Sequence, residues 1–142
     1  MNFPGLIVPG GPSWHCRRAL VGKRQHLSIY NAHIDPHAGV RRQLAQHEAI
    51  LAHADRLPAH EPTLLVGDFN TLSREAQVRM RQLLEARGYQ TPMPTGVATW
   101  RAGLYRLHAD WIFLRHARAL RWGIARPLGV SDHWPVWIEI EL

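Results

Sequence analysis

The sequence predicts a single α/β domain in which two helices pack against a layered, mixed sheet. Short runs rich in β-branched and aromatic residues are typical of strands, and two longer stretches carry apolar residues at helical spacing. Strand-like and helix-like segments alternate through the first half of the chain, which favours helices on the face of a sheet. The expected order of elements is β-β-α-β-α-(β)-β-β-β.

Composition limits the class of protein and of partner. The chain has 142 residues, enough for one domain with one core, and 46% of them are hydrophobic, which excludes a disordered chain. The formal net charge of +6 favours anionic partners such as nucleic acid or phosphorylated metabolites. Sixteen of the seventeen basic residues are arginine, and no run is longer than two, so the sequence has no basic arm.

The N-terminal region and the cysteine content bear on location. Cys16 is the single cysteine, so an internal disulfide is excluded and a reducing, cytoplasmic location is expected. Residues 1–8 are apolar but follow no basic region, which argues against a signal peptide or a membrane span. Residues 1–16 are rich in Pro and Gly, and they are predicted to form an irregular leader before a domain at 17–142.

The first half of the chain is predicted to form two strands, a helix and a third strand. Strands are expected at 19–21 and 27–33, and a fully apolar strand at 63–66. Helical spacing runs over 40–57 and ends at Pro58. In the strand at 27–33, the residues expected on one face are Leu27, Ile29, Asn31 and His33. In the helix, the expected apolar stripe is Val40, Leu44, Leu51 and Ala54, with Arg41, Arg42, Gln46 and Glu48 outside it.

The second half begins with a helix whose ends are marked. Ser73 is a suitable N-cap, the helix is predicted to run to Arg87, and Gly88 is the expected residue after its C-cap. A loop with several prolines follows. Strands are then expected at 97–100, 104–114, 120–124 and 136–142. In the last of these, the residues expected to point inward are Val136, Ile138, Ile140 and Leu142, with Glu139 and Glu141 outward.

A carboxylate and an amide follow the apolar strand at 63–66. Gly67 allows the chain to bend, and an extended backbone would point Asp68 and Asn70 the same way while turning Phe69 into the core. Ligands of open α/β sheets bind at the carboxyl ends of strands, which is where this pair lies. The alternative is an Asx turn that caps the next helix.

Further polar positions lie at or just after apolar strands: His33, Asp110 and the pair Asp132–His133. Hydrolysis of a phosphate ester needs these residue types, because a hard cation binds carboxylate and amide oxygens, a water must be oriented, and charge on phosphorus needs donors. The alternative is a structural histidine and a turn. His108 alternates with Asp110 and could replace it, although Asp110 is favoured. The remaining histidines are expected to be solvated or packed: His15, His26, His37, His47, His53, His60 and His116.

The motifs YNAHID, LLVGDFNT, HADWIF and SDHWPV, in this order, resemble those of the endonuclease/exonuclease/phosphatase superfamily, which includes deoxyribonuclease I. The resemblance covers the chain from about Arg17 onward. It implies a layered α/β sandwich of the deoxyribonuclease I-like type. It also implies a hydrolase of phosphate esters, with nucleic acid as one candidate substrate, in which water attacks phosphorus in line and Mg²⁺ or Mn²⁺ stabilises charge.

The first two motifs supply three roles by this resemblance. His33 would donate a hydrogen bond to the phosphate or the leaving group. Asp68 would orient the attacking water and contact the metal. Asn70 would bind a phosphate oxygen and help to hold the ion.

The last two motifs supply the other roles. Asp110 would fix the orientation of His133, which would contact the scissile phosphate, and Asp132 would be a metal ligand. Ala109 stands where the family often has Ile, a change expected only to loosen packing.

The sequence departs from the family upstream of its first motif. There the family has a strand with an Asn and then the Glu that is its principal metal ligand, whereas this chain has the leader. Glu48, Glu61 and Glu75 do not match that position. The chain is therefore expected to correspond to the C-terminal part of the domain, with the N-terminal part missing. Weaker metal binding and an uncovered apolar sheet face, prone to self-association or to binding a partner chain, are the expected consequences.

Two alternatives compete with a phosphate-ester hydrolase of this superfamily. A non-catalytic truncated remnant or binding module would keep the fold and the charge without turnover. A calcineurin-like metallophosphoesterase is disfavoured, because the sequence has no GNH motif. Arg17, Arg18 and Arg101 are candidates for phosphate contacts, and residues 96–105 for a substrate-facing loop.

Overall fold

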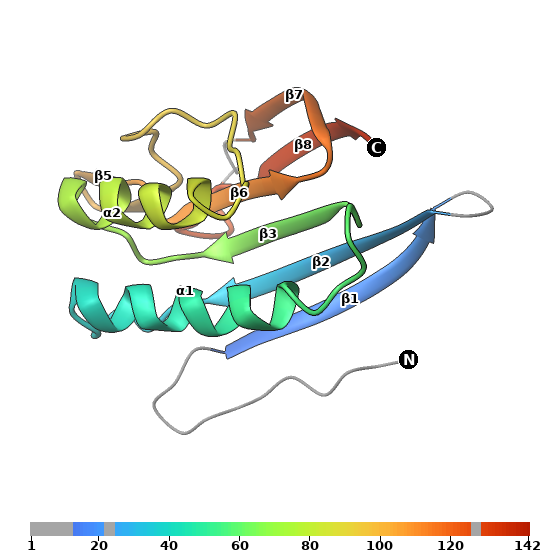
Figure 1. Ribbon diagram of the computed structural model, residues 1–142. Helices are drawn as coiled ribbons and strands as arrows, with labels where there is room; N and C mark the ends of the chain where they lie inside the picture. The colour runs from blue at the N-terminus through green and yellow to red at the C-terminus, as the bar shows by residue number, and fades with distance from the viewer. Residues whose placement is uncertain (1–12, 22–24, 126–128) are drawn as a thin grey trace.

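The computed structural model describes residues 13–21, 25–125 and 129–142, and it confirms the mixed α/β architecture (Figure 1). A four-stranded sheet has the order β1-β2-β3-β6, and β4–β5 and β7–β8 form two-stranded sheets. The elements are β1 (Ser13–Val21), β2 (Gln25–His33), α1 (Val40–Ala54), β3 (Thr63–Asp68), α2 (Arg74–Glu85), β4 (Trp100–Ala102), β5 (Tyr105–Leu107), β6 (Asp110–Arg115), β7 (Arg118–Ile124) and β8 (Val136–Glu141).

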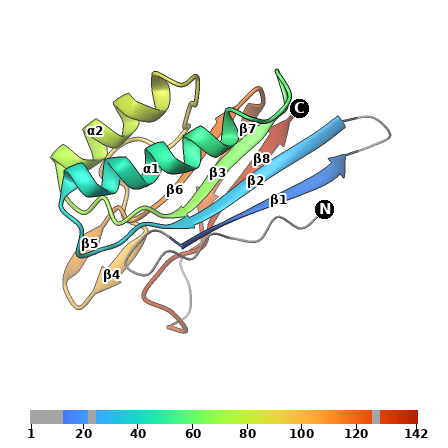
Figure 2. The same cartoon turned by 60° about the horizontal axis from the view of Figure 1, so that its bottom comes forward.

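The four-stranded sheet is mixed because α1 connects two of its strands as a crossover. Strand β2 pairs antiparallel with β1 and parallel with β3, and β3 pairs antiparallel with β6. Both helices lie side by side along the same face of this sheet (Figure 2). Neither described helix has the length and hydropathy needed to cross a membrane.

The main core lies between the sheet and the helices. Tyr30, Leu65 and Phe113 stand opposite one another on β2, β3 and β6, and all three are buried. Because side chains alternate along a strand, the residues between them point to the other face of the sheet. The β2–β3–β6 register therefore separates a helix-covered face from an open one.

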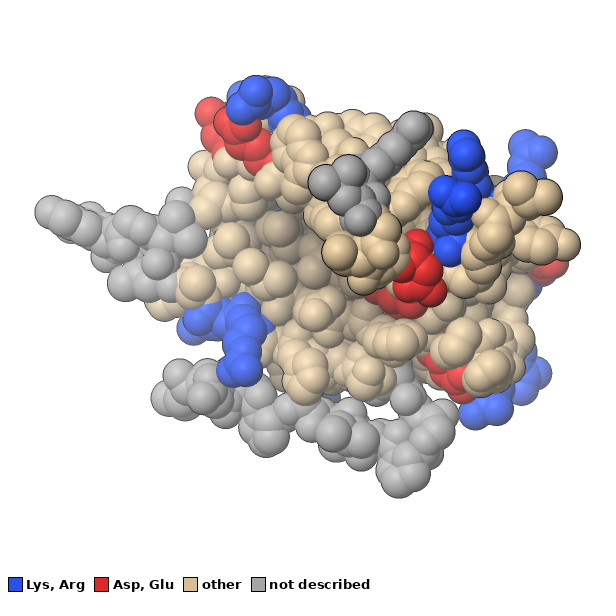
Figure 3. Space-filling view, turned by 180° about the vertical axis from the view of Figure 1, so that it is seen from behind, with Lys and Arg blue, Asp and Glu red and all other residues tan. Residues whose placement is uncertain are grey.

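The open face carries a groove of about 600 Å³. Ile29, Leu64 and Ile112 line it from the sheet, while Val136 and Ile138 line it from β8. The apolar face expected to be uncovered is thus partly covered by the β7–β8 hairpin. Seen from behind the molecule, the Arg side chains form separate groups instead of one continuous patch (Figure 3).

Strand β1 begins earlier than the sequence predicted. Residues 13–16 were assigned to the leader, but Ser13–Val21 forms one strand. The residues that decide this are Trp14 and Cys16, which are buried and alternate with the exposed Ser13, His15 and Arg17. This is the period of two of a half-buried strand. The rest of the predicted leader, like the connection at 22–24, lies outside the described residues.

Helix α1 buries a more polar face than predicted. Gln46, expected outside the apolar stripe, is buried with Gln43 and His47, whereas Val40 and Leu44 are only half-buried. Most of these polar groups have partners: His47 Nδ1 lies 2.8 Å from the Gln43 carbonyl, and the two glutamine side chains hydrogen-bond to the loop backbone. His47 Nε2 has no partner among the described residues. The orientation of α1 is therefore set by hydrogen bonds between its glutamine side chains and the loop backbone as well as by burial of apolar side chains.

Helix α2 confirms its predicted N-cap but ends two residues earlier than predicted, at Glu85 with Ala86 as its C-cap, so Gly88 is not the residue directly after the C-cap. The Ser73 hydroxyl accepts a hydrogen bond from the Ala76 amide at 3.1 Å, and Gly88 has a positive φ of 78°. The strand predicted at 104–114 is instead two strands, because β4 turns at Gly103 and pairs with β5 before the chain enters β6. A short hairpin therefore stands in front of the strand that carries Asp110.

Candidate functional site

Three of the predicted site residues form a row across the open face of the sheet. His33 is paired with Asp68 in the register of β2 and β3, and Asp68 is paired with Asp110 in the register of β3 and β6. All three are the terminal residues of their strands at the same edge of the sheet. The pairing of the three strands thus brings His33 and Asp110, which are 77 positions apart in the sequence, into one row with Asp68.

Asp68 lies between two histidines. Its Oδ2 is 3.7 Å from His33 Nε2 and 3.8 Å from His133 Nε2. Burial raises the pKa of Asp68 above its ordinary value; the nearby charge of Asp110 adds to this, while the Asn70 amide and the two histidines oppose it. Asp68 is thus a carboxylate with two imidazoles within reach of one oxygen.

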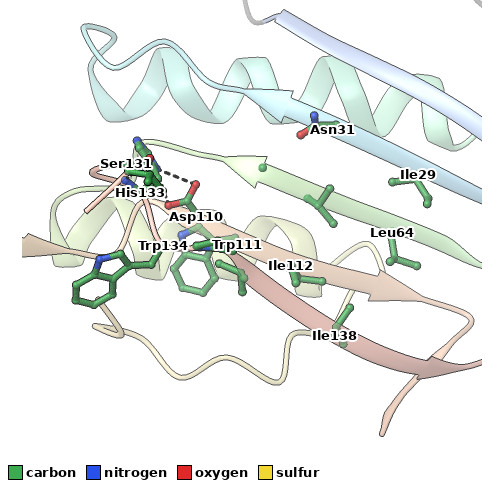
Figure 4. Close-up of a pocket in the computed structure, with 15 residues that line it drawn as sticks. Ile29, Asn31, Leu64, Asp110, Trp111, Ile112, Ser131, His133, Trp134 and Ile138 are labelled. Carbon is green, nitrogen blue, oxygen red and sulfur yellow. Dashed lines mark hydrogen bonds and ion pairs between the residues drawn. The ribbon is translucent and has the colours of Figure 1, made fainter. Parts of the chain in front are cut away.

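His133 is held by Asp110. Its Nδ1 lies 2.9 and 3.1 Å from the two oxygens of the Asp110 carboxylate (Figure 4). An ionised carboxylate only accepts hydrogen bonds, so the Nδ1 proton is donated to Asp110 and Nε2 faces Asp68. Burial alone would lower the pKa of His133, but the hydrogen bond to Asp110 and its charge outweigh it and raise that pKa. The orienting role of Asp110 stays a prediction, and this contact is the one that such a role requires.

Asn70 departs from the extended backbone expected after Asp68. Its φ is +49°, and its amide N–H donates to Asp68 Oδ1 at 3.0 Å, which forms an Asx turn. This turn does not cap the next helix, as the alternative had it, because Ser73 is the N-cap of α2. The Asn70 side-chain nitrogen donates to the Ile34 carbonyl at 2.8 Å. Phe69 is fully buried, as expected. The turn therefore leaves Oδ2 of Asp68 for the histidines and joins the ends of β2 and β3.

Asp132 is exposed, and its side chain is bound by a tryptophan. The indole Nε1–H of Trp100 donates to Asp132 Oδ2 at 2.9 Å. This hydrogen bond lowers the pKa of Asp132. Asp132 is therefore ionised and oriented beside His133.

The oxygen atoms of Asp68, Asn70 and Asp132 are of the kind that Mg²⁺ or Mn²⁺ binds. Among the described residues, however, no group of three or more His, Cys, Asp or Glu side chains is arranged to hold an ion. The glutamates do not complete a set: Glu61 accepts hydrogen bonds from Arg18 and Ser28, and Glu75 is paired with Arg79. The oxygen atoms of Asp68, Asn70 and Asp132 are of the chemical kind that a hard cation binds. They are fewer than the six or more ligands that such an ion takes.

His108 does not belong to the row. It precedes β6, is 1% exposed, and stacks on Trp111 with ring centroids 3.6 Å apart. Burial lowers its pKa to about 4, so the ring is neutral near pH 7. The choice of Asp110 over His108 agrees with this placement.

Two residues at the site were not identified from the sequence. Thr99 and Trp100 fall in the strand expected at 97–100 and in the candidate substrate-facing loop at 96–105, but neither is predicted to contact a site residue. Both contact the segments that carry Asp110 and Asp132. No local signal could have found these contacts, because 11 and 32 positions separate the partners.

Family comparison agrees with these motifs. The model of the Endonuclease/Exonuclease/phosphatase family matches residues 2–133. Comparison of the sequence with curated proteins finds no significant match.

Solved structures share the fold at low sequence identity. A functionally unknown conserved protein from Enterococcus faecalis V583 is 20% identical, with a TM-score of 0.73 over 96% of this chain and 60% of that one. D. rerio TDP2, in complex with a single-strand DNA product, is 16% identical, with a TM-score of 0.72 over 92% of this chain and 62% of that one. The mannosyl-6-phosphatase of Bacteroides thetaiotaomicron is 17% identical, with a TM-score of 0.64 over 92% and 57%.

This chain spans about 60% of the length of the first two of these structures. Their identities are too low to carry a function, but the fold is shared. With a family match over residues 2–133 and the deoxyribonuclease I-like fold, the chain belongs to the endonuclease/exonuclease/phosphatase family.

Proposed function

We propose that this chain carries the catalytic part of a divalent-metal-dependent hydrolase of phosphate esters, in which water attacks phosphorus in line. The observation that carries the proposal is the cluster at the sheet edge. Asp110 orients His133, and Asp68 Oδ2 lies within 4 Å of His33 and His133. A carboxylate beside two imidazoles offers both an acceptor for a water proton and donors for phosphate oxygens.

Each site residue has a proposed task. Asp68 accepts a hydrogen bond from the attacking water and so orients it. His33, the more exposed of the two histidines, donates to the phosphate or the leaving group. His133, held by Asp110, donates from Nε2 to a phosphate oxygen, where charge increases in the transition state.

The proposed metal, Mg²⁺ or Mn²⁺, would be held by Asp68, Asn70 and Asp132. When bound, such an ion stabilises negative charge on the phosphate. The donor atoms are hard oxygens, which supports this class of ion. Because the three residues supply fewer ligands than the six or more that hard cations take, we expect weak binding, with water in the remaining positions.

The substrate class is a phosphate ester, with nucleic acid as one candidate. TDP2 with its single-strand DNA product and a mannosyl-6-phosphatase share this fold, which supports phosphate esters in general without choosing among them. The net charge of +6 favours an anionic substrate. The single cysteine supports a cytoplasmic location, which fractionation of cells would test.

A non-catalytic remnant or binding module is the second candidate. One observation favours it: the described residues contain no group of three acidic, histidine or cysteine side chains arranged for a metal. Such a protein would bind a phosphate ester without turning it over.

Cleavage of a generic phosphodiester separates these candidates. The purified chain is incubated with bis(p-nitrophenyl) phosphate, and with a labelled single-stranded oligonucleotide, in Mg²⁺, Mn²⁺ or EDTA. We expect weak cleavage with either metal, none in EDTA, and a loss of at least about 100-fold in Asp68→Ala and in His133→Asn.

The matched control is His60→Asn, which changes an exposed histidine beside His116, away from the row. It should cleave like the wild type. Oligonucleotide binding without cleavage would favour the binding module. Cleavage that is unaffected by either site substitution would contradict the assignment of the site.

A further inference from the structure

We propose that Thr99 and Trp100 are positioning residues that hold the two catalytic segments, Asp110 on β6 and Asp132–His133 before β8, in one arrangement. The catalytic meaning of this inference rests on the proposed function, while its geometry stands without it. Asp110 and His133 are 23 positions apart; Asp110 begins β6 of the four-stranded sheet, whereas His133 lies in the loop before β8, so their contact depends on how those segments are fixed.

Thr99 fixes the segment that carries Asp110. It is fully buried, and its hydroxyl oxygen accepts hydrogen bonds from the backbone N–H of Ala109 at 3.0 Å and of Asp110 at 2.8 Å. A hydroxyl oxygen has two acceptor sites, so this one side chain satisfies two consecutive buried amides. The start of β6, and with it the root of the Asp110 side chain, is thereby set.

The backbone of the same segment fixes the loop that carries Asp132 and His133. The Thr99 carbonyl accepts from the Trp134 amide at 2.7 Å, and the Arg101 amide donates to the Asp132 carbonyl at 2.9 Å. Trp100 stands between these two bonds and forms a β-bridge with His133. Residues 99–101 therefore hydrogen-bond to both catalytic segments.

Trp100 adds a side-chain contact to this backbone pairing. Its indole N–H donates to Asp132 Oδ2 at 2.9 Å, and its ring lies 6.5 Å from the His133 ring, centroid to centroid. The indole thus sets the orientation of an exposed carboxylate that would otherwise rotate in solvent. Because displacements of about 1 Å in an active site cost on the order of 100-fold in rate, fixing both segments matters for turnover.

The first test compares Thr99→Val with Thr99→Ser. Valine keeps the shape of threonine and removes the hydroxyl, while serine keeps the hydroxyl and removes the methyl group. At a temperature where both are folded, we expect kcat to fall about 10- to 100-fold in Thr99→Val, with KM changed less than about 3-fold, and to be mostly retained in Thr99→Ser.

The second test uses Trp100→Phe, which keeps an aromatic ring and removes the N–H. Trp137→Phe, a half-exposed tryptophan on β8, is the matched control. We expect kcat to fall about 10-fold in Trp100→Phe and to be unchanged in Trp137→Phe. Because Trp100 is partly exposed, we expect Trp100→Phe to fold, and this test can be made even if Thr99→Val fails to fold.

Amide and indole NMR spectra of the metal-free protein report on the hydrogen bonds of Thr99 and Trp100 and do not depend on catalytic activity. The Asp110 amide signal should shift in Thr99→Val and stay in Thr99→Ser, and the Trp100 indole signal should shift in Asp132→Ala. If the wild type has no turnover, the proposed function fails and these spectra alone decide on the positioning role. Unchanged Asp110 and Trp100 signals, or equal kcat in wild type, Thr99→Val and Trp100→Phe, would overturn it.

Discussion

Asp68 shows how one side chain is divided between structure and chemistry. One of its oxygens closes the turn with the Asn70 amide, and the other lies between the two histidines. The two readings of GDFN, a turn and a ligand-binding carboxylate, therefore describe different atoms of the same residue. Sequence patterns place such a residue but cannot assign its separate oxygens.

The pair Asp110–His133 gives a prediction at this scale. Asp110→Asn removes the negative charge that raises the pKa of His133, so that pKa should fall. NMR titration of the His133 ring in both proteins measures this. An unchanged His133 pKa would contradict the hydrogen bond at 2.9 Å.

A buried histidine gives a prediction for acid stability. The pKa of His108 is lowered to about 4 by burial, against 6.5 for a free histidine, so between these pH values the unfolded chain binds the extra proton. The contribution of His108 to the free energy of unfolding is therefore complete above pH 6.5 and is lost as the pH falls toward 4. For the whole shift in pKa this loss amounts to roughly 3 kcal/mol. His108→Phe keeps a ring against Trp111 and cannot titrate.

Urea unfolding at pH 7, 5.5 and 4.5 measures this effect. The free energy of unfolding should decline less steeply with acid in His108→Phe than in the wild type, with His47 still contributing because its pKa is also lowered to about 4. Equal slopes in His108→Phe and wild type would refute the account.

At the scale of elements, segments with a strong sequence pattern were predictable, but the rotation of a helix about its axis, which sets its buried face, was not. Ser73 marked the start of α2, although the helix ends at Glu85 and not at the predicted Arg87. The alternation in β8 placed Glu139 and Glu141 outward, where they pair with Arg121 and Arg118. The buried face of α1 was missed, because Gln43 and Gln46 are buried through hydrogen bonds to loops that sequence periodicity does not register.

Gly67 gives a prediction at the element scale. Its φ is +128°, and a Cβ built there would lie 2.1 Å from the Ala32 carbonyl oxygen of the neighbouring strand. Gly67→Ala must therefore push β2 and β3 apart, and we expect a loss of at least about 2 kcal/mol in the free energy of unfolding. The same measurement on Gly39→Ala, where a Cβ meets nothing within 4 Å, should show a loss below about 1 kcal/mol. Equal losses would contradict the close approach.

At the scale of the molecule, the sequence placed His33 and Asp68 at the ends of predicted strands, whereas Asp110 was expected inside a strand at 104–114 and instead begins β6. The contact of Asp110 with His133 came from family resemblance, since no spacing rule joins residues 23 positions apart. The contacts of Thr99 and Trp100 with the site could not be predicted from the sequence, because the β4–β5 hairpin brings these residues to it. The groove on the open face also depends on the whole fold, since β2, β3, β6 and β8 all line it.

The groove predicts association in solution. Ile29, Leu64 and Ile112 present apolar surface there that β8 covers only in part, and burying it against a second copy would be favourable. Analytical ultracentrifugation should show a species larger than the 16.2 kDa monomer as concentration rises. Ile29→Glu should weaken this association, whereas Val78→Glu, on the exposed side of α2, should not. A monomer at every concentration would contradict the prediction.

The most direct test of the whole account is a double-mutant cycle on metal-dependent phosphodiester cleavage, with Asp68→Ala, His133→Asn and the two combined. Residues that act on one phosphate lose their effects non-additively, because either substitution alone disables the site. We predict that the double variant is no slower than the slower single variant. Losses that multiply, or a wild-type rate in either single variant, would show that these two side chains do not form one catalytic site.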